Sequence, residues 1–230
     1  SGVLKNNPPI KLGSKRISYE SIYNYIYEGK GKYEYLYPHL RKGGFRRRKR
    51  RNRKVRSCNN IPFKTSIHSR PEGINLKTTY GHWESDSIVA LRGTKYNLSV
   101  QYERKSMLVK VNKVKNKSAL ETENAIRKAI DDLPKYLWKS ITFDNGGESA
   151  THTILRREYD IKTYHCDPYA SWQKGGVENI NGLIRQYFPK GTNFDKIDDK
   201  DKNLVEKRLN NRPRKSLNYK TPNEIIAELI

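Results

Sequence analysis

Cysteine, methionine and long apolar runs are scarce in this 230-residue chain, which contains two cysteines and one methionine. Cys58 and Cys166 have no CxxC spacing and no histidine cluster beside them, so neither a zinc site nor a disulfide framework is indicated. The sequence shows no long apolar segment, no signal-peptide core and no amphipathic anchor, which argues against a membrane partner. Two thiols in a chain of this length fit a reducing cytoplasm.

Acidic residues are also few, because 24 Asp and Glu stand against 47 Lys and Arg, a formal charge of +23. A basic excess of this size is typical of proteins that bind a polyanion, and nucleic acid is the first candidate. The hydrophobic fraction of 34% is low but still able to build a core. The composition therefore predicts a folded protein with a nucleic-acid partner.

Residues 1–40 predict a small helical segment. Ser18 is a candidate N-cap for a helix that stops at Gly29, and a second short helix is expected over residues 33–40. Their tyrosines are expected in a core rather than stacked on bases. Two short helices ahead of a basic run are typical of a helix-turn-helix module or of a small packing unit, and the spacing does not separate these alternatives.

Residues 41–73 predict a basic arm and a linker. Between residues 41 and 56, eleven of sixteen residues are Lys or Arg and none is acidic. Like charges at this density repel one another, so we expect an extended arm that orders against phosphates. The alternative is a solvated linker, although such linkers normally mix charges of both signs. The arm residues predicted to contact nucleic acid are Arg46, Arg47, Arg48, Lys49, Arg50, Arg51 and Arg53.

Residues 74–230 have the pattern of a compact α/β domain. Three β-favouring runs, 82–91, 96–103 and 107–114, are separated by connections of hairpin length, which predicts an antiparallel meander. Ser118, followed by Glu121, caps a predicted helix that ends near Pro134 and has Leu120 on its apolar face.

The pattern then continues with a strand that leads into Asp144, a helix at about 150–159, a strand at 161–165 and a helix at about 176–187. This order predicts a mixed five-stranded sheet with helices on its faces, followed by a helical tail. In the last helix, Val177, Ile180, Ile184, Tyr187 and Phe188 are expected to pack inward.

Asp144 follows directly on the β-favouring run Ile141-Thr142-Phe143 and precedes Asn145-Gly146-Gly147. These turn residues accept left-handed dihedral angles, so we expect a sharp exit from the strand with the carboxylate held rigidly at its end. The alternative is an aspartate that only caps the turn.

Two further carboxylates need an explanation. Asp86 lies within the first predicted strand, where an edge position or a local hydrogen bond is the simpler account. Glu178 lies near the start of the last predicted helix, where it could merely complement the helix dipole. Together with Asp144, however, they fit a site for two Mg²⁺ or Mn²⁺ ions, because these ions prefer carboxylate oxygens and need a bridging acid flanked by others.

The motifs around these acids resemble those of the insertion sequence thirty family of transposases, and the resemblance covers about residues 17–230. The matching segments are His82-Trp83-Glu84-x-Asp86, Glu103-Arg104-Lys105-Ser106, Phe143-Asp144-Asn145-Gly146, Asp167-Pro168-Tyr169, Ser171-Trp172-Gln173-Lys174-Gly175, Glu178-Asn179-x-Asn181-Gly182-Leu183, and Leu209-Asn210-x-Arg212-Pro213-Arg214-Lys215. The chain departs from the family by having Gly176-Val177 where a Thr-Asn pair is usual.

The resemblance implies a ribonuclease-H-like fold and a DDE transposase that cleaves the ends of a mobile element and joins the 3′-hydroxyl to target DNA. It maps the catalytic and metal-binding acids onto Asp86, Asp144 and Glu178, with 33 residues between the last two. Asp86 would bridge two Mg²⁺ or Mn²⁺ ions, while Asp144 and Glu178 would each complete one coordination sphere. The implied partner is double-stranded DNA, bound by a homo-oligomer, in the cytoplasm of a prokaryote and associated with the nucleoid.

Residues outside the triad receive supporting roles in this hypothesis. Asn145, Asn179, Asn181 and Trp172 would position substrate or neighbouring groups. The predicted DNA contacts outside the arm are Trp172, Lys190, Arg212, Arg214 and Lys215.

Two other functions remain open at this point. A non-catalytic DNA-binding regulator could keep the fold without the reaction, although the intact acids argue against it. A ribonuclease-H-type nuclease would share the triad but would not require the basic arm or the segment Arg212-Pro213-Arg214.

Overall fold

The computed structural model describes residues 19–27, 30, 33–40, 61–168 and 170–230. Two compact units divide the chain, the first formed by residues 1–56 with 213–220 and the second by residues 57–212 with 221–230. The predicted arm, including Arg46 to Arg53, lies outside the described residues. The domain limits expected at residues 40 and 73 therefore stay a prediction.

The first unit contains helix α2 (Tyr19–Tyr27), as expected, but the second predicted helix is wrong. Residues 33–40 contain only the 3-10 turn η2 (Tyr37–His39), because Tyr35 has a left-handed φ of 51° and interrupts a right-handed helix. The α2 tyrosines are not core residues either, since Tyr23, Tyr25 and Tyr27 are 42–50% exposed.

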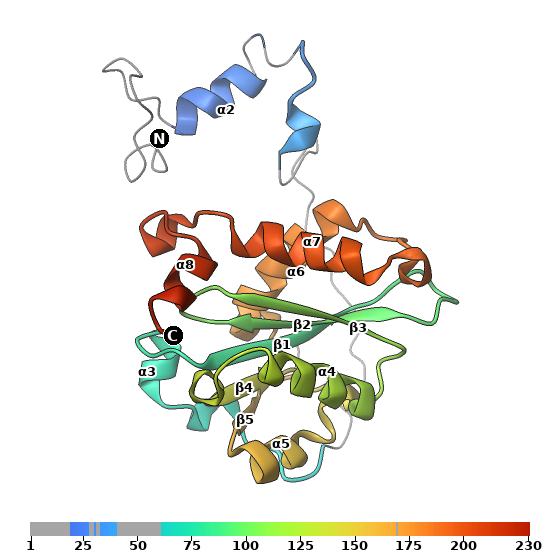
Figure 1. Ribbon diagram of the computed structural model, residues 1–230, viewed down its shortest axis with the longest axis vertical. Coiled ribbons are helices and arrows are strands. Elements are labelled where there is room, and N and C mark those ends of the chain that lie inside the picture. Colours follow the sequence, from blue (N-terminus) through green and yellow to red (C-terminus); the bar gives the residue numbers. More distant parts are fainter. Residues whose placement is uncertain (1–18, 28–29, 31–32, 41–60, 169) are drawn as a thin grey trace. The chain divides into compact units, whose positions relative to one another are not determined.

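The second unit is built on a five-stranded sheet in the order β3-β2-β1-β4-β5 (Figure 1). Its strands are β1 (His82–Ile88), β2 (Asn97–Glu103), β3 (Val109–Val114), β4 (Ser140–Phe143) and β5 (Lys162–His165). The first three pair antiparallel, whereas β4 runs parallel to both β1 and β5. The predicted meander and mixed sheet are thus confirmed.

Helices cover both faces of this sheet, and Figure 1 shows α6 and α7 on one face with α4 and α5 on the other. The helices of this unit are α3 (Glu72–Asn75), α4 (Ala119–Asp131), α5 (His152–Tyr159), α6 (Gly175–Tyr187), α7 (Asp199–Asn210) and α8 (Pro222–Ala227). The Ser118 hydroxyl accepts the backbone N–H of Glu121 at 3.3 Å, which confirms the predicted cap of α4.

The two faces of the sheet have separate cores because side chains alternate along a strand. Val100 and Tyr102 of β2 pack with α6 and α7, in a cluster that also contains Ile180 and Leu209. Trp83 of β1 points to the other face, where α4 and α5 pack, and its ring stacks on Trp138 at 3.9 Å between centroids. Even-numbered residues of β1 therefore face α6.

Two residues expected in the core are exposed. Leu120 is 60% exposed because it belongs to the first turn of α4, away from the buried stripe that contains Ile126 and Ile130. Tyr187 is 39% exposed at the last position of α6, where the Arg208 guanidinium lies over its ring at 5.8 Å.

Short 3-10 turns complete this unit, and two of them border the site described below. They are η3 (Ile67–Ser69), η4 (Lys135–Leu137), η5 (Gly147–Ser149), η6 (Ser171–Lys174) and η7 (Phe194–Lys196), and η8 (Lys215–Leu217) belongs to the first unit. Over the described ranges of the chain, no helix has the length and apolar character needed to span a membrane.

Candidate active site

Asp86 and Asp144 come together because of the register between two parallel strands. Each paired residue of β4 lies 58 positions after its partner in β1, as in Glu84 with Thr142. Asp144 follows the last residue of β4 and lies 58 positions after Asp86, so continuing the register sets the two aspartates side by side. Both carboxylates thus lie at one end of the sheet, on the face that α6 covers.

Glu148 adds a third carboxylate that the sequence reasoning missed. Single carboxylate oxygens of Asp86, Asp144 and Glu148 all lie within 4.8 Å of one another. Glu148 is only 8% exposed, and its Oε2 atom accepts the hydroxyl of Ser87 at 3.0 Å and pairs with Lys117 Nζ at 3.1 Å. Burial raises the pKa of this carboxyl and the nearby Asp144 adds to the rise, whereas Lys117 opposes it.

Two side chains of the η6–α6 segment hold the Asp86 carboxylate. Asn181 Nδ2 donates to Asp86 Oδ2 at 2.7 Å, and Lys174 Nζ lies 3.4 Å from Asp86 Oδ1 while it donates to the Ser85 carbonyl at 2.8 Å. Burial lowers the pKa of Lys174, but Asp86, Asp144 and Glu148 outweigh this effect and leave it raised. A protonated lysine is therefore built into the group of acids.

Glu178 lies on the face of α6 that carries Asn181, but it does not belong to the group of three carboxylates described above. It is exposed, one turn after Lys174 and one turn before Asn181. Side chains three and four positions apart share one face of a helix, so Glu178 lies between two residues that both contact Asp86. Within α6, Val177 and Ile180 are fully buried, which fixes the direction of this face.

The turn after Asp144 differs from the expected one. Gly146 has a φ of −77°, and none of the residues Asn145, Gly146 and Gly147 adopts a left-handed conformation. Instead, the Gly146 N–H donates to Asp144 Oδ1 at 2.8 Å, and a Cβ on Gly146 would lie 2.8 Å from the same oxygen. Glycine is needed here so that the backbone can approach the carboxylate, not for a positive φ.

Asn145 has two strong contacts of its own. Its Nδ2 donates to the Cys166 carbonyl at 2.6 Å, and its Oδ1 accepts from Lys64 Nζ. These bonds connect the exit from β4 to the exit from β5 and to the segment before β1. The Asn145 side chain thus stabilises the turn that follows Asp144.

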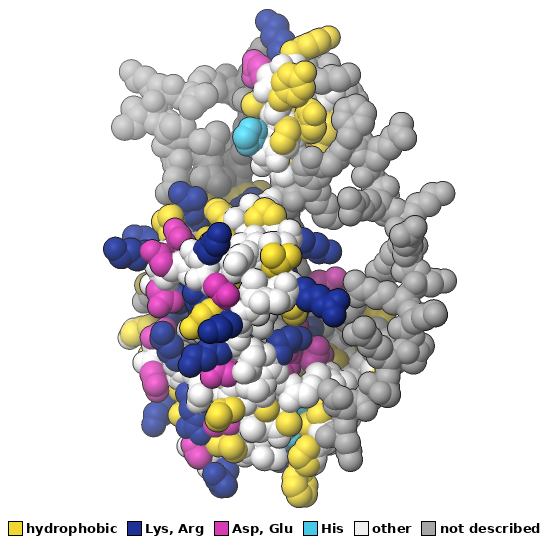
Figure 2. All heavy atoms as spheres, turned by 90° about the vertical axis from the view of Figure 1, so that its right-hand side faces the viewer, with side chains coloured by type: hydrophobic (Ala, Val, Ile, Leu, Met, Phe, Trp, Pro, Cys, Tyr) yellow, Lys and Arg dark blue, Asp and Glu magenta, His cyan; other side chains and the backbone are white. Residues whose placement is uncertain are grey.

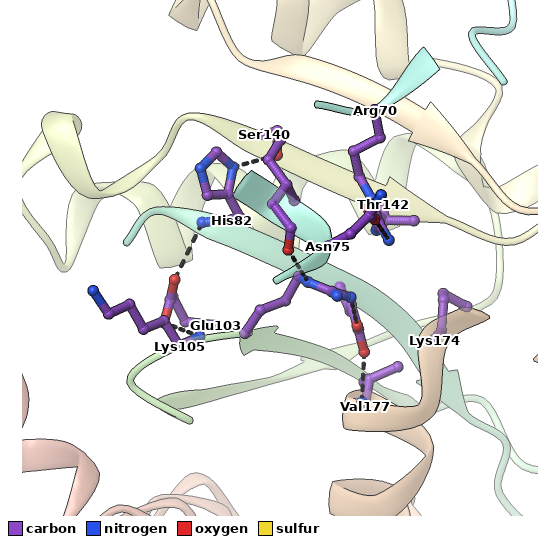
Figure 3. Close-up of polar contacts among 12 residues, drawn as sticks. Arg70, Asn75, His82, Glu103, Lys105, Ser140, Thr142, Lys174 and Val177 are labelled. Carbon is purple, nitrogen blue, oxygen red and sulfur yellow. Dashed lines mark hydrogen bonds and ion pairs between the residues drawn. The ribbon is translucent and has the colours of Figure 1, made fainter. Parts of the chain in front are cut away.

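A buried hydrogen-bond network connects β1 to α6, and Figure 3 labels its members His82, Glu103 and Val177. Glu84, which is 1% exposed, accepts the N–H of Val177 at 2.8 Å and pairs with the Arg104 guanidinium. Glu103 is equally buried and accepts the N–H groups of Gly81, at 2.9 Å, and His82, at 3.2 Å. The sequence reasoning quoted these acids only as parts of motifs, although the parity of Glu84 with Asp86 indicates the same face of β1.

The predicted DNA contacts outside the arm differ in exposure. Trp172 in η6 is 74% exposed, and Lys190, Arg212 and Lys215 are exposed as well. Arg214 is only 8% exposed. Figure 2 shows that basic and acidic side chains alternate on one face of the second unit, without one continuous basic stripe.

Comparison with known proteins identifies two groups of similar chains. The transposase of insertion sequence element IS4351 from Bacteroides fragilis is 38% identical over 218 residues, which cover 95% of this chain and 66% of that protein. Transposase InsI of element IS30A from Escherichia coli K12 is 37% identical over 230 residues, which cover 98% of this chain and 59% of that protein. The chain thus spans about three fifths to two thirds of the length of these relatives.

Solved structures share the fold. The catalytic core domain of HTLV-2 integrase, determined with magnesium, has a TM-score of 0.50 and 24% identity, and the match covers 63% of this chain and 95% of that one. A chain of the simian T-cell lymphotropic virus intasome, determined with a PP2A regulatory subunit, has a TM-score of 0.54 and 18% identity, and the match covers 75% of this chain and 60% of that one. A search of protein-family models gave no match.

Proposed function

We propose, from the fact that this chain belongs to the IS30 family of insertion-sequence transposases, that it cleaves the ends of a mobile element and joins the freed 3′-hydroxyl to target DNA. The observation that carries the proposal is the closeness of the Asp86 and Asp144 carboxylates, whose oxygens lie within 4.8 Å, where β1 and β4 run parallel in an integrase-like sheet. Carboxylates at such a position serve phosphoryl transfer, in which positioning and charge stabilisation supply most of the catalysis.

The donor set fits Mg²⁺ or Mn²⁺. Three carboxylates have oxygens within 4.8 Å of one another, and hard divalent cations prefer such oxygen ligands. Asp86, Asp144 and Glu178 would hold two ions, with Glu148 as a further acid beside Asp144. When bound, the ions would supply Lewis acidity at the attacking and leaving oxygens.

The chain's own residues prepare this site by orienting Asp86. Asn181 and Lys174 each contact a different oxygen of its carboxylate, at 2.7 and 3.4 Å, so the side chain is held by both oxygens. Lys174 also offsets the mutual repulsion of the acids, which lie close together at this end of the sheet. Glu178, exposed on the same helical face, would complete the ligand set when DNA and cations bind.

DNA binding follows from charge. The chain has a formal charge of +23, and eleven basic residues lie between residues 41 and 56. The arm would contact backbone phosphates without reading bases, while Lys190, Arg212, Arg214 and Lys215 would add further phosphate contacts. Trp172 presents an exposed indole close in sequence to Lys174, where it could stack on an unpaired base. A homo-oligomer on DNA is proposed because two element ends must be brought together, and a related fold occurs in an intasome.

To test this proposal, the purified chain is incubated with three substrates in the presence of Mg²⁺ or Mn²⁺. They are duplexes that carry the ends of the element encoding the chain, a supercoiled target plasmid, and an RNA–DNA hybrid. We expect nicking at the 3′ ends followed by joining to the plasmid. DNA binding without cleavage would instead indicate a regulator, and cleavage of the hybrid without joining would indicate a ribonuclease-H-type nuclease.

A further inference from the structure

The first turn of α6 lies against the sheet through one close contact. A Cβ built on Gly176 would lie 2.2 and 2.7 Å from two ring carbons of Tyr102 and 2.8 Å from Glu84 Oε2. No heavy atom would lie within 4 Å of a Cβ on the neighbouring Gly175. The helix therefore approaches the sheet at Gly176 as closely as glycine allows.

The same turn is also tied to the sheet by a hydrogen bond. Glu84 Oε2 accepts the Val177 N–H at 2.8 Å, and Glu84 Oε1 accepts from the Arg104 guanidinium. Glu84 and Arg104 are 1% and 7% exposed, so water does not compete for this contact. A buried carboxylate at the amino end of a helix also interacts favourably with the helix dipole.

These two contacts involve Gly176 and Val177, the two residues that directly precede Glu178. Gly176 sets the closest distance between α6 and β2, and Glu84 fixes Val177 from β1. A helix is rigid over a single turn, so the position of Glu178 above the sheet is determined by them. Glu84 also lies two residues before Asp86 on the same face of β1, so it is connected to both Asp86 and Glu178.

We propose that Glu84, Tyr102 and Gly176 are positioning residues that set the height of Glu178 over Asp86. This inference rests on the proposed function, in which Glu178 is a metal ligand. The Tyr102 ring occupies the space that a larger residue at position 176 would require. Tyr102 and Gly176 thus form a matched pair in this chain.

The test measures Mn²⁺ affinity by calorimetric titration, together with single-turnover nicking of element-end DNA. Gly176→Ala forces α6 away from the sheet, whereas Gly175→Ala is the matched control because its methyl group meets open space. We expect Gly176→Ala to weaken Mn²⁺ binding by about 10- to 100-fold, as is typical for residues that orient metal ligands. Gly175→Ala should bind as the unmodified chain does.

A structural role alone gives a different result. Gly176→Ala would then lower the melting temperature and leave Mn²⁺ affinity unchanged, which would overturn the inference. If circular dichroism shows that Gly176→Ala does not fold, Glu84→Leu takes its place, because leucine has a similar size and removes the acceptor of the Val177 N–H. Unchanged Mn²⁺ affinity in Glu84→Leu would equally overturn the inference.

Glu178→Gln separates failure of this inference from failure of the proposed function. If Glu178→Gln loses Mn²⁺ affinity and nicking while Gly176→Ala keeps both, only the positioning inference is wrong. If Glu178→Gln itself binds Mn²⁺ and nicks DNA like the unmodified chain, Glu178 is no ligand, and the inference falls together with that assignment.

Discussion

Lys174 and Lys202 are two buried lysines with different surroundings, and their comparison yields a quantitative prediction. Each is 6% exposed and donates to a backbone carbonyl, Lys174 to Ser85 at 2.8 Å and Lys202 to Val111 at 2.9 Å. Burial lowers the pKa of Lys202, whereas for Lys174 the neighbouring carboxylates overcome burial and raise the pKa. Lys174→Met should therefore leave the repulsion among the neighbouring carboxylates uncompensated, whereas Lys202→Met should not affect it.

The size of the effect follows from the contact with Asp86. At 3.4 Å, two unit charges attract by about 5 kcal/mol at an effective dielectric constant of 20. Removing one partner of a buried pair costs about 3–5 kcal/mol, but the Asp86 side chain is 28% exposed and still reaches water. We therefore expect Lys174→Met to lower the free energy of unfolding by about 2–3 kcal/mol without divalent metal.

Bound Mn²⁺ replaces the missing positive charge, so the loss should shrink when the cation saturates the site. The assay is urea unfolding of both variants and the unmodified chain, in EDTA and in excess Mn²⁺. Lys174→Met should gain more stability from Mn²⁺ than the unmodified chain gains. An equal loss in EDTA and in Mn²⁺, as expected for Lys202→Met, would refute the coupling of Lys174 to the acids.

Three further predictions concern the basic arm, two buried histidines and the acid Glu178. Deleting residues 41–56 should weaken binding to all DNA sequences alike and flatten the dependence of log K on log salt, and an unchanged slope in filter-binding assays would exclude phosphate contacts by the arm. Burial lowers the pKa of His82 and of His165 to about 4, so the free energy of unfolding should decrease as the pH falls from 6.5 towards 4, by at most about 3 kcal/mol for each histidine. In urea titrations over this pH range, His165→Phe should lose less stability than the unmodified chain, and His68→Phe, at an exposed position, is the control. Glu178→Gln should reduce the nicking rate by orders of magnitude, whereas a charge that only complements the helix dipole would cost about 0.3–1 kcal/mol of stability and leave the rate unchanged; Glu148→Gln, measured alongside, should have the smaller effect on the rate.

Local patterns predicted the elements of the sheet well. Three alternating runs with hairpin-length connections gave the antiparallel meander, and Ser118 with Glu121 marked the start of α4. The expectation that Asp144 terminates a strand also holds, because the strand residues and the turn residues are adjacent in the sequence. These features depend on contacts between residues that are close along the chain.

Contacts between distant residues were not predictable in this way. Lys174 and Asn181 contact Asp86 across about 90 positions, and Glu84 bonds to Val177 across 93. Glu148 joins the acids because η5 turns it back towards Asp144, and the spacing of four residues was the only local signal. Solvent exposure of the α2 tyrosines was missed because an amphipathic pattern does not show whether another element covers the helix.

Strand transfer with an already cleaved element end tests the central claim most directly, since it isolates the joining reaction. A labelled duplex that ends in a free 3′-hydroxyl is mixed with a supercoiled plasmid and with either the unmodified chain or Asp144→Asn. We predict that the unmodified chain joins the two DNAs only with Mg²⁺ or Mn²⁺, and that Asp144→Asn binds the duplex equally well but gives no joined product. Joining in EDTA, or undiminished joining by Asp144→Asn, would contradict the assignment of this site as a carboxylate-based phosphoryl-transfer centre.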